Sequence, residues 1–215
     1  MKAAIFDLDG VIVDTVPLHF KAWQRMFSGY GIDFNFDDYK KKVDGIPRLD
    51  GARAILTNLD EEKLKEACER KQKYFLQNLS EEEIKIYDST VRLIKELKSR
   101  EIKVAVISSS KNLRMILEKI QLTALLDTVV SGYEFTKGKP DPEIFLIAAH
   151  RLQVSPDECV VFEDALLGVE AAKKAGMVCV GVDRYKKPSR LARADVVVGD
   201  LAETDFERLK ALFKR

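Results

Sequence analysis

The sequence predicts an α/β fold: an open, doubly wound parallel sheet with a helical cap domain inserted after the first strand. Six short apolar runs rich in Val and Ile recur along the chain, and amphipathic stretches separate them. Strands covered on both faces of a parallel sheet have this non-alternating apolar pattern. Their alternation with helices indicates right-handed crossovers within one open sheet. A long stretch without a strand interrupts the alternation and predicts the insert.

The predicted core elements follow one another in a regular order. Strands are expected at residues 3–6, 102–108, 128–131, 158–163, 178–183 and 194–199. Helices are expected at residues 89–100, 112–122, 141–152 and 165–176. Apolar side chains recur at helical spacing in these four stretches, which is typical of helices that pack on a sheet.

The interruption after the first strand predicts four amphipathic helices and no strand. These helices are expected at residues 17–27, 36–43, 48–56 and 61–79. Because the alternation of strands and helices resumes afterwards, the helical stretch is an insert and not a separate terminal domain. We therefore predict a core domain formed by residues 1–15 and 80–215 and a cap domain formed by residues 16–79.

Composition excludes several classes of partner. The 215 residues contain 36 basic and 35 acidic side chains, and no basic stripe interleaved with aromatic residues predicts a nucleic-acid partner. No segment approaches the ~18 uninterrupted apolar residues of a membrane span. Cys68, Cys159 and Cys179 are scattered, as expected for buried thiols in a reducing cytosol. A cytoplasmic monomer is expected, since the cap would already cover the site.

Two carboxylates and a glycine follow the first predicted strand. Asp7 and Asp9 lie at its carboxyl end, with Gly10 next in sequence. Open α/β sheets bind ligands at this end of their strands. A tight turn there lets Asp7 and a nearby carbonyl share one hard cation while Asp9 points elsewhere. Asp-Gly is also a common plain turn, so this motif alone leaves both interpretations open.

Three further polar groups follow later strands. Glu163 and Asp164 end one apolar run, where they complete an octahedral Mg²⁺ site or simply cap the next helix. The serine-rich residues 108–112 close another strand and open a helix, where hydroxyls and amides favour a bound phosphate, although serine runs also form plain loops. Lys139 precedes two prolines on a stiffened turn, or is an ordinary surface lysine.

These four groups point to one chemistry because they should meet. The carboxyl ends of parallel strands lie at the same edge of a sheet, so the four groups are expected to converge there. Acids near a cation, a hydroxyl-rich anion site and a lysine supply the charge neutralisation and in-line positioning that phosphoryl transfer needs. The sequence therefore predicts a phosphoryl-transfer enzyme with Mg²⁺ as its cofactor.

The same motifs resemble those of the haloacid dehalogenase (HAD) superfamily. The segment IFDLDGV, the strand-final Ser108, Lys139 in GKPDPEIF and the FED segment at residues 162–164 match its four motifs in order. The resemblance extends from residue 2 to about residue 198 and implies a Rossmann-like core. It also implies a helical cap between the first and second motifs, where the helical stretch lies.

The resemblance implies a role for each matching residue. Asp7 would be the nucleophile, and Asp9 would be the general acid and base. Ser108 and Ser109 would hold the transferring phosphoryl group, while Lys139 would neutralise its charge and that of Asp7. The implied metal ligands are Asp7, the backbone carbonyl of Asp9, and Asp164, with Glu163 supporting from nearby or through water.

Within the superfamily, the chain is most similar to β-phosphoglucomutases and their phosphatase relatives. This similarity rests on residues outside the four motifs, which are Asp14, Thr15, His19, Trp23, Gly45, Arg48, Lys71 and the SSSKN segment. The implied substrate-binding residues are Thr15, His19, Arg48, Lys71, Ser109, Ser110, Lys111 and Asn112. Among them, His19 would help control the acid/base residue, and Lys71 would face the sugar. Arg48, Ser110, Lys111 and Asn112 would bind a second, unreactive phosphate. For His19, Arg48 and Lys71 the alternative is a surface role, and for Trp23 a position in the cap core.

Some residues depart from the mutases. Asp44 stands where a basic residue is expected, Pro47 and Leu49 flank Arg48, and Gly51 replaces a small hydroxyl residue. An acid near the distal phosphate would weaken its binding. We therefore expect a phosphatase whose partner is a small phosphorylated metabolite, such as a sugar phosphate. The alternatives are β-phosphoglucomutase, a non-catalytic phosphometabolite-binding protein, and a haloacid dehalogenase proper, which would need neither Asp9 nor a metal.

Overall fold

The computed structural model describes residues 1–44, 46–184 and 188–214. The chain forms two compact units, one made of Met1–Asp14 with Lys85–Arg215 and the other of Thr15–Ile84. Gly45, one of the residues on which the resemblance to β-phosphoglucomutases rests, lies outside the described residues. Each unit has its own hydrophobic core and is described by itself.

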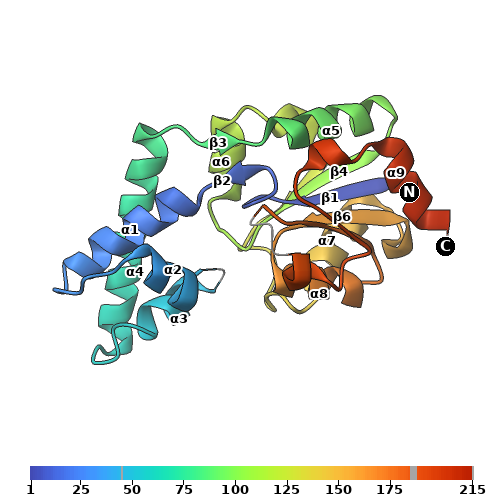
Figure 1. Ribbon diagram of the computed structural model, residues 1–215. Coiled ribbons are helices and arrows are strands. Elements are labelled where there is room, and N and C mark those ends of the chain that lie inside the picture. The colour runs from blue at the N-terminus through green and yellow to red at the C-terminus, as the bar shows by residue number, and fades with distance from the viewer. Residues whose placement is uncertain (45, 185–187, 215) are drawn as a thin grey trace. The chain divides into compact units, whose positions relative to one another are not determined.

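The larger unit is built on a six-stranded parallel sheet with the order β5-β4-β1-β6-β7-β8 (Figure 1). The strands are β1 (Ala3–Asp7), β4 (Lys103–Ile107), β5 (Thr128–Val130), β6 (Cys159–Glu163), β7 (Val178–Val182) and β8 (Val196–Val198). Each coincides with one of the six apolar runs. The predicted α/β fold with an open, doubly wound parallel sheet is therefore confirmed.

Strand β1 lies between the two halves of this sheet. The chain passes from β1 to β4 and β5 on one side and then returns to build β6, β7 and β8 on the other. In the register of the sheet, Asp7 lies beside Ile107, and Phe6 lies between Val106 and Phe162. Ligands of open α/β sheets bind where the strand order reverses in this way. The end of β1 is thus the place where this fold creates a site.

Helices cover both faces of the sheet. They are α5 (Asp88–Ser99), α6 (Leu113–Lys119), α7 (Glu143–Leu152), α8 (Leu166–Lys174) and α9 (Phe206–Ala211). Helices α7 and α8 bury Phe145 and Ala171 in one cluster with Ile5, Ile107 and Val161, while α5 packs on β4 from the opposite face (Figure 1). Short 3-10 helices occur at Thr123–Leu125, Pro156–Glu158, Pro188–Leu191, Leu201–Glu203 and Leu212–Lys214.

The smaller unit, residues Thr15–Ile84, contains the four predicted helices and is called the cap unit below; the larger unit is the core unit. The four helices are α1 (Val16–Ser28), α2 (Phe36–Lys42), α3 (Arg48–Arg53) and α4 (Glu61–Glu81). Side chains define where α2 and α4 begin, because Asn35 accepts a hydrogen bond from the backbone N–H of Asp38 and Asp60 accepts one from Lys63. Helices α1 and α4 pack together over an aromatic core that includes Trp23, which is 4% exposed.

A two-stranded antiparallel pair joins the two places where the chain crosses between the units. Strands β2 (Val13–Asp14) and β3 (Lys85–Ile86) pair through Val13 with Ile86 and Asp14 with Lys85. Strands of two residues are too short to show an apolar pattern, so they could not be predicted from the sequence. The core unit resumes at Lys85, five residues beyond the predicted residue 80, because α4 continues to Glu81.

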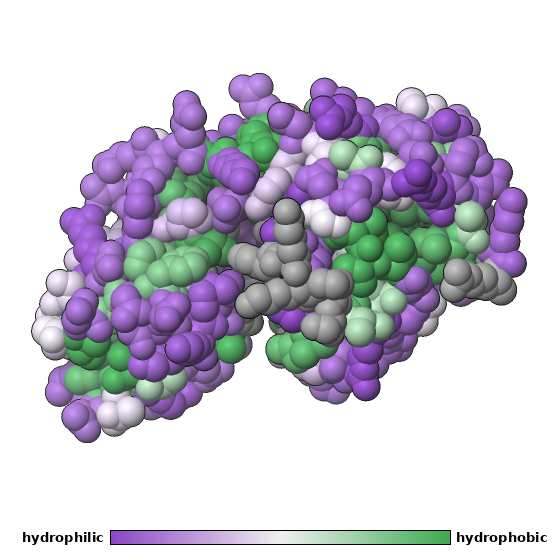
Figure 2. Space-filling model, in the orientation of Figure 1, coloured by the Kyte–Doolittle hydropathy of each residue, from purple (hydrophilic) through white to green (hydrophobic). Residues whose placement is uncertain are grey.

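The face of the molecule shown in Figure 2 is mainly hydrophilic. Polar and charged side chains predominate on this face. Among the described residues, no helix combines the length and apolar character that a membrane crossing requires. Cys68, Cys159 and Cys179 are all free thiols, and the last two are buried.

Candidate active site

Asp7 and Lys139 form an ion pair at the end of β1. The Nζ of Lys139 donates to Oδ1 of Asp7 at 2.5 Å and to Oε2 of Glu163 at 2.7 Å. The lysine side chain is 12% exposed, so Lys139 is not the ordinary surface residue that its sequence also allowed. Burial lowers the pKa of Lys139, but the two carboxylates outweigh burial and hold it above the usual value, so the ammonium is charged.

Three carboxylates meet beside this lysine. Asp7, Glu163 and Asp164 each offer one oxygen, and these oxygens lie within 4.8 Å of one another. Burial raises the pKa of Asp164 well above its usual value, and the charges of Glu163 and Asp7 add to the effect. Burial likewise raises the pKa of Glu163, against the opposing charge of Lys139.

The donor set fits a hard divalent cation. When all three carboxylates are ionised, their charge exceeds that of the single ammonium by two units. A bound cation would stabilise the ionised carboxylates against the burial and mutual repulsion that raise these pKa values. Carboxylate oxygens are also the ligands that Mg²⁺ and Ca²⁺ prefer.

A glycine makes room for the acids after β1. Gly10 has φ +79°, and a Cβ there would lie 2.1 Å from Oδ2 of Asp164. Only glycine combines this left-handed backbone with such a close approach. The Asp-Gly turn therefore packs directly against the acidic cluster, as the cation-site interpretation of that motif requires.

Gly168 in α8 makes room for the Glu163 side chain in the same way. A Cβ at Gly168 would lie 2.0 Å from Cδ of Glu163. We expect Gly168→Ala to lower the free energy of unfolding by about 2 kcal/mol, as overpacking does, although alanine favours helices. Urea denaturation measures this. The matched control is Gly138→Ala, whose Cβ meets nothing within 4 Å and which should change stability by less than about 0.5 kcal/mol. Equal stability of the two variants would contradict the prediction.

Asp9 lies outside the acidic cluster and faces Ser108 instead. The Oγ of Ser108 donates to Oδ2 of Asp9 at 3.2 Å and accepts from the backbone N–H of Ser110 at 2.9 Å. The backbone N–H of Asp9 in turn donates to Oδ2 of Asp7 at 3.0 Å. The two carboxylates after β1 are thus separated, one beside Lys139 and one beside a hydroxyl. That separation suits a nucleophile and a proton carrier with different tasks.

The rest of the serine-rich segment leads into α6, which begins at Leu113. The Oγ of Ser110 accepts from the backbone N–H of Asn112, which is 4% exposed and precedes the helix. Ser109 and Lys111 are exposed, and Nζ of Lys111 lies 4.9 Å from the ring centroid of Tyr133. Buried Ser108 and exposed Ser109 therefore present hydroxyls at different depths of the same strand end.

In the cap unit, His19 and Lys71 contact each other. The Nζ of Lys71 lies 2.8 Å from Nδ1 of His19, and the imidazole stacks on Phe75 with centroids 4.2 Å apart. Burial, followed by the charges of Lys71 and Arg48, holds the pKa of His19 well below its usual value. The imidazole is therefore neutral and accepts the lysine hydrogen bond at Nδ1.

Lys71 is the most buried of the predicted cap residues with a charge. It is 3% exposed, and its Nζ lies 5.1 Å from the ring centroid of Trp23. Arg48 at the start of α3 is half-buried, and Thr15 is fully buried before α1. Asp44, the unexpected acid, forms an ion pair with Lys40, so its charge is already compensated. The predicted residues thus form two groups, one at the sheet edge and one within the cap unit.

One site contact was missed by the sequence analysis. Arg184 follows β7, and its guanidinium donates to the backbone carbonyls of Gly10 and Val11. The signal was available, because an arginine directly after a buried strand lies at the same sheet edge as the other motifs.

Comparison with known protein families identifies the family to which these motifs belong. A family model for haloacid dehalogenase-like hydrolases matches residues 4–182. The chain belongs to this family. As a haloacid dehalogenase-like protein with an intact set of motif residues, it is a phosphohydrolase or a phosphomutase, and the suspected relationship is confirmed.

Relatives of this haloacid dehalogenase-like chain include both kinds of enzyme. It is 36% identical to a β-phosphoglucomutase of Bacillus subtilis over 97% of this chain and 94% of the relative. It is 34% identical to a phosphorylated carbohydrates phosphatase of Thermotoga maritima over 82% of each chain. A crystal structure of β-phosphoglucomutase from Clostridium difficile superposes with a TM-score of 0.90 at 31% identity, covering 100% of this chain and 97% of that one.

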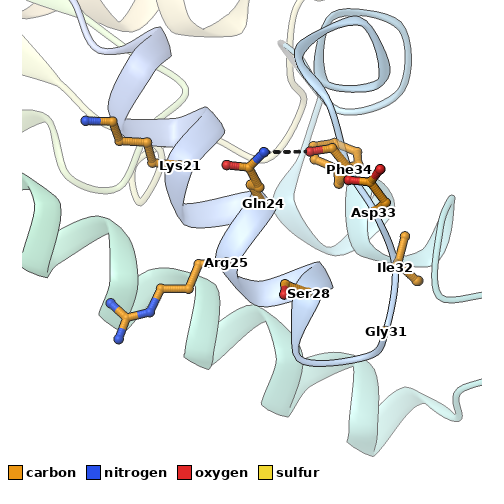
Figure 3. A pocket seen from close by; sticks show the side chains of 8 residues that line it. All are labelled: Lys21, Gln24, Arg25, Ser28, Gly31, Ile32, Asp33 and Phe34. Carbon is orange, nitrogen blue, oxygen red and sulfur yellow. Dashed lines mark hydrogen bonds between the residues drawn. The ribbon is translucent and has the colours of Figure 1, made fainter.

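A hollow on the cap unit lies apart from these residues. It has a volume of about 590 Å³, and Figure 3 shows its lining side chains on α1 and on the segment that follows. Two cations in the lining already have partners, since Lys21 pairs with Glu82 at 2.5 Å and Arg25 donates to Gln77 at 2.9 Å. None of the residues predicted for the site lines this hollow, and we assign it no function.

Proposed function

We propose that the chain is a Mg²⁺-dependent phosphatase of small sugar phosphates that acts through an aspartyl-phosphate on Asp7. The contact that carries the proposal is the Lys139 ammonium shared between Asp7 and Glu163, next to a third carboxylate. This arrangement orients one Asp7 oxygen and supplies positive charge where a phosphate dianion would approach. A binding protein would need neither a nucleophile nor the separate proton carrier Asp9.

The reaction would proceed in two displacements. In the first, a carboxylate oxygen of Asp7 attacks phosphorus, the ester P–O bond breaks, and Asp9 gives its proton to the leaving oxygen. In the second, Asp9 takes a proton from a water molecule that attacks the phosphoenzyme, which releases phosphate and restores Asp7. Ser108 and Ser109 would hold the phosphoryl oxygens, and Lys139 would neutralise their charge.

The metal would support the first displacement. Its proposed ligands are Asp7, the backbone carbonyl of Asp9, and Asp164, with Glu163 nearby. Bound Mg²⁺ would supply the charge that screens the repulsion between Asp7 and the phosphate. The raised pKa of Asp164, which is half-buried beside two other carboxylates, supports this assignment, because a cation would stabilise its ionised form.

Removal of the metal is expected to abolish turnover. A chelator should reduce phosphate release to background, and added Mg²⁺ should restore it. Asp164→Asn should raise the Mg²⁺ concentration needed for half-maximal rate by about 10-fold or more, on the scale of changes to a metal's ligand environment. Asp183→Asn, at the end of the next strand, is the control. Unchanged turnover with chelator would contradict the metal proposal, whereas loss of turnover would exclude a haloacid dehalogenase proper, which needs no metal.

The choice of sugar phosphates rests on relatives and on the cap unit. The curated relatives include a phosphorylated carbohydrates phosphatase and a fructose-1-phosphate phosphatase of Escherichia coli. In the cap unit, Lys71, Arg48 and the neutral His19 offer hydrogen-bond donors of the kind that hydroxyl and phosphate groups require. We assign substrate binding to these three residues, to Thr15 and to the 109–112 segment.

β-Phosphoglucomutase is the second candidate. It is favoured by the relative of Bacillus subtilis, which matches nearly the whole chain, and by the contact between His19 and Lys71. A mutase would use the same Asp7 and Asp9 but keep the phosphoenzyme until a second sugar hydroxyl arrives. The ion pair of Asp44 with Lys40 reduces the repulsion that its acid would exert on a distal phosphate.

One assay separates the two candidates. β-Glucose 1-phosphate is incubated with Mg²⁺ and a trace of the 1,6-bisphosphate, and both free phosphate and glucose 6-phosphate are measured. Free phosphate as the main product supports the phosphatase, while rapid formation of glucose 6-phosphate with little free phosphate supports the mutase. Absence of turnover with a panel of sugar phosphates would contradict both and favour the phosphometabolite-binding protein.

We also propose that the enzyme is a cytoplasmic monomer. The three free thiols support a reducing compartment. Size-exclusion chromatography with light scattering tests the monomer.

A further inference from the structure

Arg184 reaches the backbone that follows Asp9. It comes directly after Asp183, beyond the end of β7, and its side chain is 12% exposed. Its Nε donates to the carbonyl of Gly10 at 3.2 Å, and its Nη2 donates to the carbonyl of Val11 at 3.3 Å. One planar guanidinium thus holds two consecutive carbonyls.

Other side chains fix the guanidinium in place. Its Nη1 forms an ion pair with Asp200, and its Cζ lies 3.6 Å from the ring centroid of Tyr87. Asp200 is itself fixed, because it accepts hydrogen bonds from the backbone N–H of Ala202 at 2.8 Å and from the side chain of Ser89. The arginine therefore has little freedom of its own and can define the position of the carbonyls that it holds.

The held segment is a tight turn. The backbone N–H groups of Ile12 and Val13 donate to the carbonyl of Leu8 at 2.9 and 3.0 Å. The carbonyl of Val11 also accepts from Oγ1 of Thr90 at 2.7 Å. Asp9 lies inside this turn, one residue before the first carbonyl that Arg184 holds.

We propose that Arg184 is a positioning residue for Asp9. By holding the Gly10 and Val11 carbonyls, the guanidinium keeps the backbone of the turn, and with it the Asp9 carboxylate, in place beside Ser108. The inference rests on the proposed function, in which Asp9 transfers the proton. Arg184 itself does not contact Asp7, Lys139 or the acidic cluster through any hydrogen bond or ion pair found among the described residues.

The proposal predicts a loss that depends on the leaving group. A sugar alkoxide must be protonated as it leaves, so phosphorylation of Asp7 by a sugar phosphate depends on the position of Asp9. A 4-nitrophenolate leaves without protonation, so phosphorylation by 4-nitrophenyl phosphate does not. A displaced Asp9 should therefore slow the first reaction far more than the second.

The test compares Arg184→Ala and Arg184→Lys with wild type in rapid mixing. We expect the phosphorylation rate of Arg184→Ala to fall about 10²-fold with the sugar phosphate, the scale of a 1 Å misplacement. With 4-nitrophenyl phosphate, the burst of nitrophenolate should slow by less than about 10-fold. General acid catalysis contributes about 10²-fold or more, so a smaller loss shows that this leaving group does not depend on Asp9. The substrate concentration that gives half of the maximal phosphorylation rate should change by less than about 3-fold, because ground-state binding is unaffected.

Chemical rescue, the lysine variant and a control variant sharpen the test. Free guanidinium should restore part of the rate of Arg184→Ala, and Arg184→Lys should be intermediate, because a compact ammonium lacks the planar fork that spans both carbonyls and Asp200. The control is Arg193→Ala, which removes an exposed arginine of the same unit that pairs with Glu170 at 3.1 Å. It should retain wild-type rates with both substrates.

Either of two results would overturn the inference. Equal loss with the two leaving groups would show a general structural role, and unchanged rates with both would show no role. Absence of turnover in wild type would instead contradict the proposed function and remove the inference with it, so the two failures are distinguishable.

Discussion

Asp7→Asn is expected to reduce turnover of every phosphate ester by about 10⁴-fold or more, as removal of a catalytic nucleophile does. The amide cannot attack phosphorus, and it also removes one oxygen from the acidic cluster. The fold should survive, because asparagine has the same shape and Asp7 lies at the end of β1, not in its middle. Turnover is measured with sugar phosphates and with 4-nitrophenyl phosphate, and folding is checked by circular dichroism.

A matched variant and a trapping experiment make this result specific. Asp157→Asn changes an exposed acid of the same unit and should leave turnover at the wild-type value. Wild-type enzyme quenched in acid during turnover should carry a labelled phosphoryl group, and Asp7→Asn should carry none. Label retained on Asp7→Asn, or turnover within 10-fold of wild type, would identify a different nucleophile.

Lys139→Met is expected to cost both stability and activity. The ammonium is the one cation that donates to Asp7 and Glu163 among the described contacts, and methionine would leave two buried carboxylates facing each other. Removing one partner of a buried ion pair costs about 3 kcal/mol or more of unfolding free energy. Turnover should fall about 10²-fold or more, the scale of losing one preorganised electrostatic contact to the transition state.

The same variant also tests the metal proposal. Without Lys139 the acids carry more uncompensated charge, so Mg²⁺ should stabilise Lys139→Met against urea more than it stabilises wild type. Lys137→Met, in the same loop but exposed, is the control and should resemble wild type in both measurements. A variant of Lys139 with wild-type stability and no larger gain from Mg²⁺ would contradict the arrangement of charges described above.

The sheet could be predicted because its strands are buried on both faces. Runs such as VAVI at residues 104–107 leave no solvent-facing position, and only a parallel sheet between helices buries such a run completely. The pair β2 and β3 and helix α9 were missed because they lack such a run. Strands β2 and β3 have only two residues each, and most residues of α9, such as Arg208, are exposed, so neither length nor apolar periodicity distinguishes these elements from loops.

The sheet edge of the site could be predicted because its residues follow strands. Asp7, Ser108 and Glu163 end or directly follow β1, β4 and β6, so the strand order alone brings them together. The depth of Lys71 and the hydrogen bonds of Arg184 could not be predicted in the same way, although the place of Arg184 after a strand puts it at this edge. Both depend on contacts with residues far away in the sequence, such as His19 and Gly10, which no local pattern encodes.

The central position of β1 has a consequence for biosynthesis. Ala3 pairs with both Lys103 and Cys159, so β1, which is synthesised before both of its partner strands, cannot complete its pairing until β6 has been made. The cap unit, in contrast, is one continuous segment whose helices can pack as soon as they emerge. Because long-range pairing is slow and exposes an unpaired apolar strand, nascent chains released before β6 should aggregate or be degraded. The proposed nucleophile is synthesised before the cap unit and before β4 and β6, and it would be among the last residues to reach its working environment.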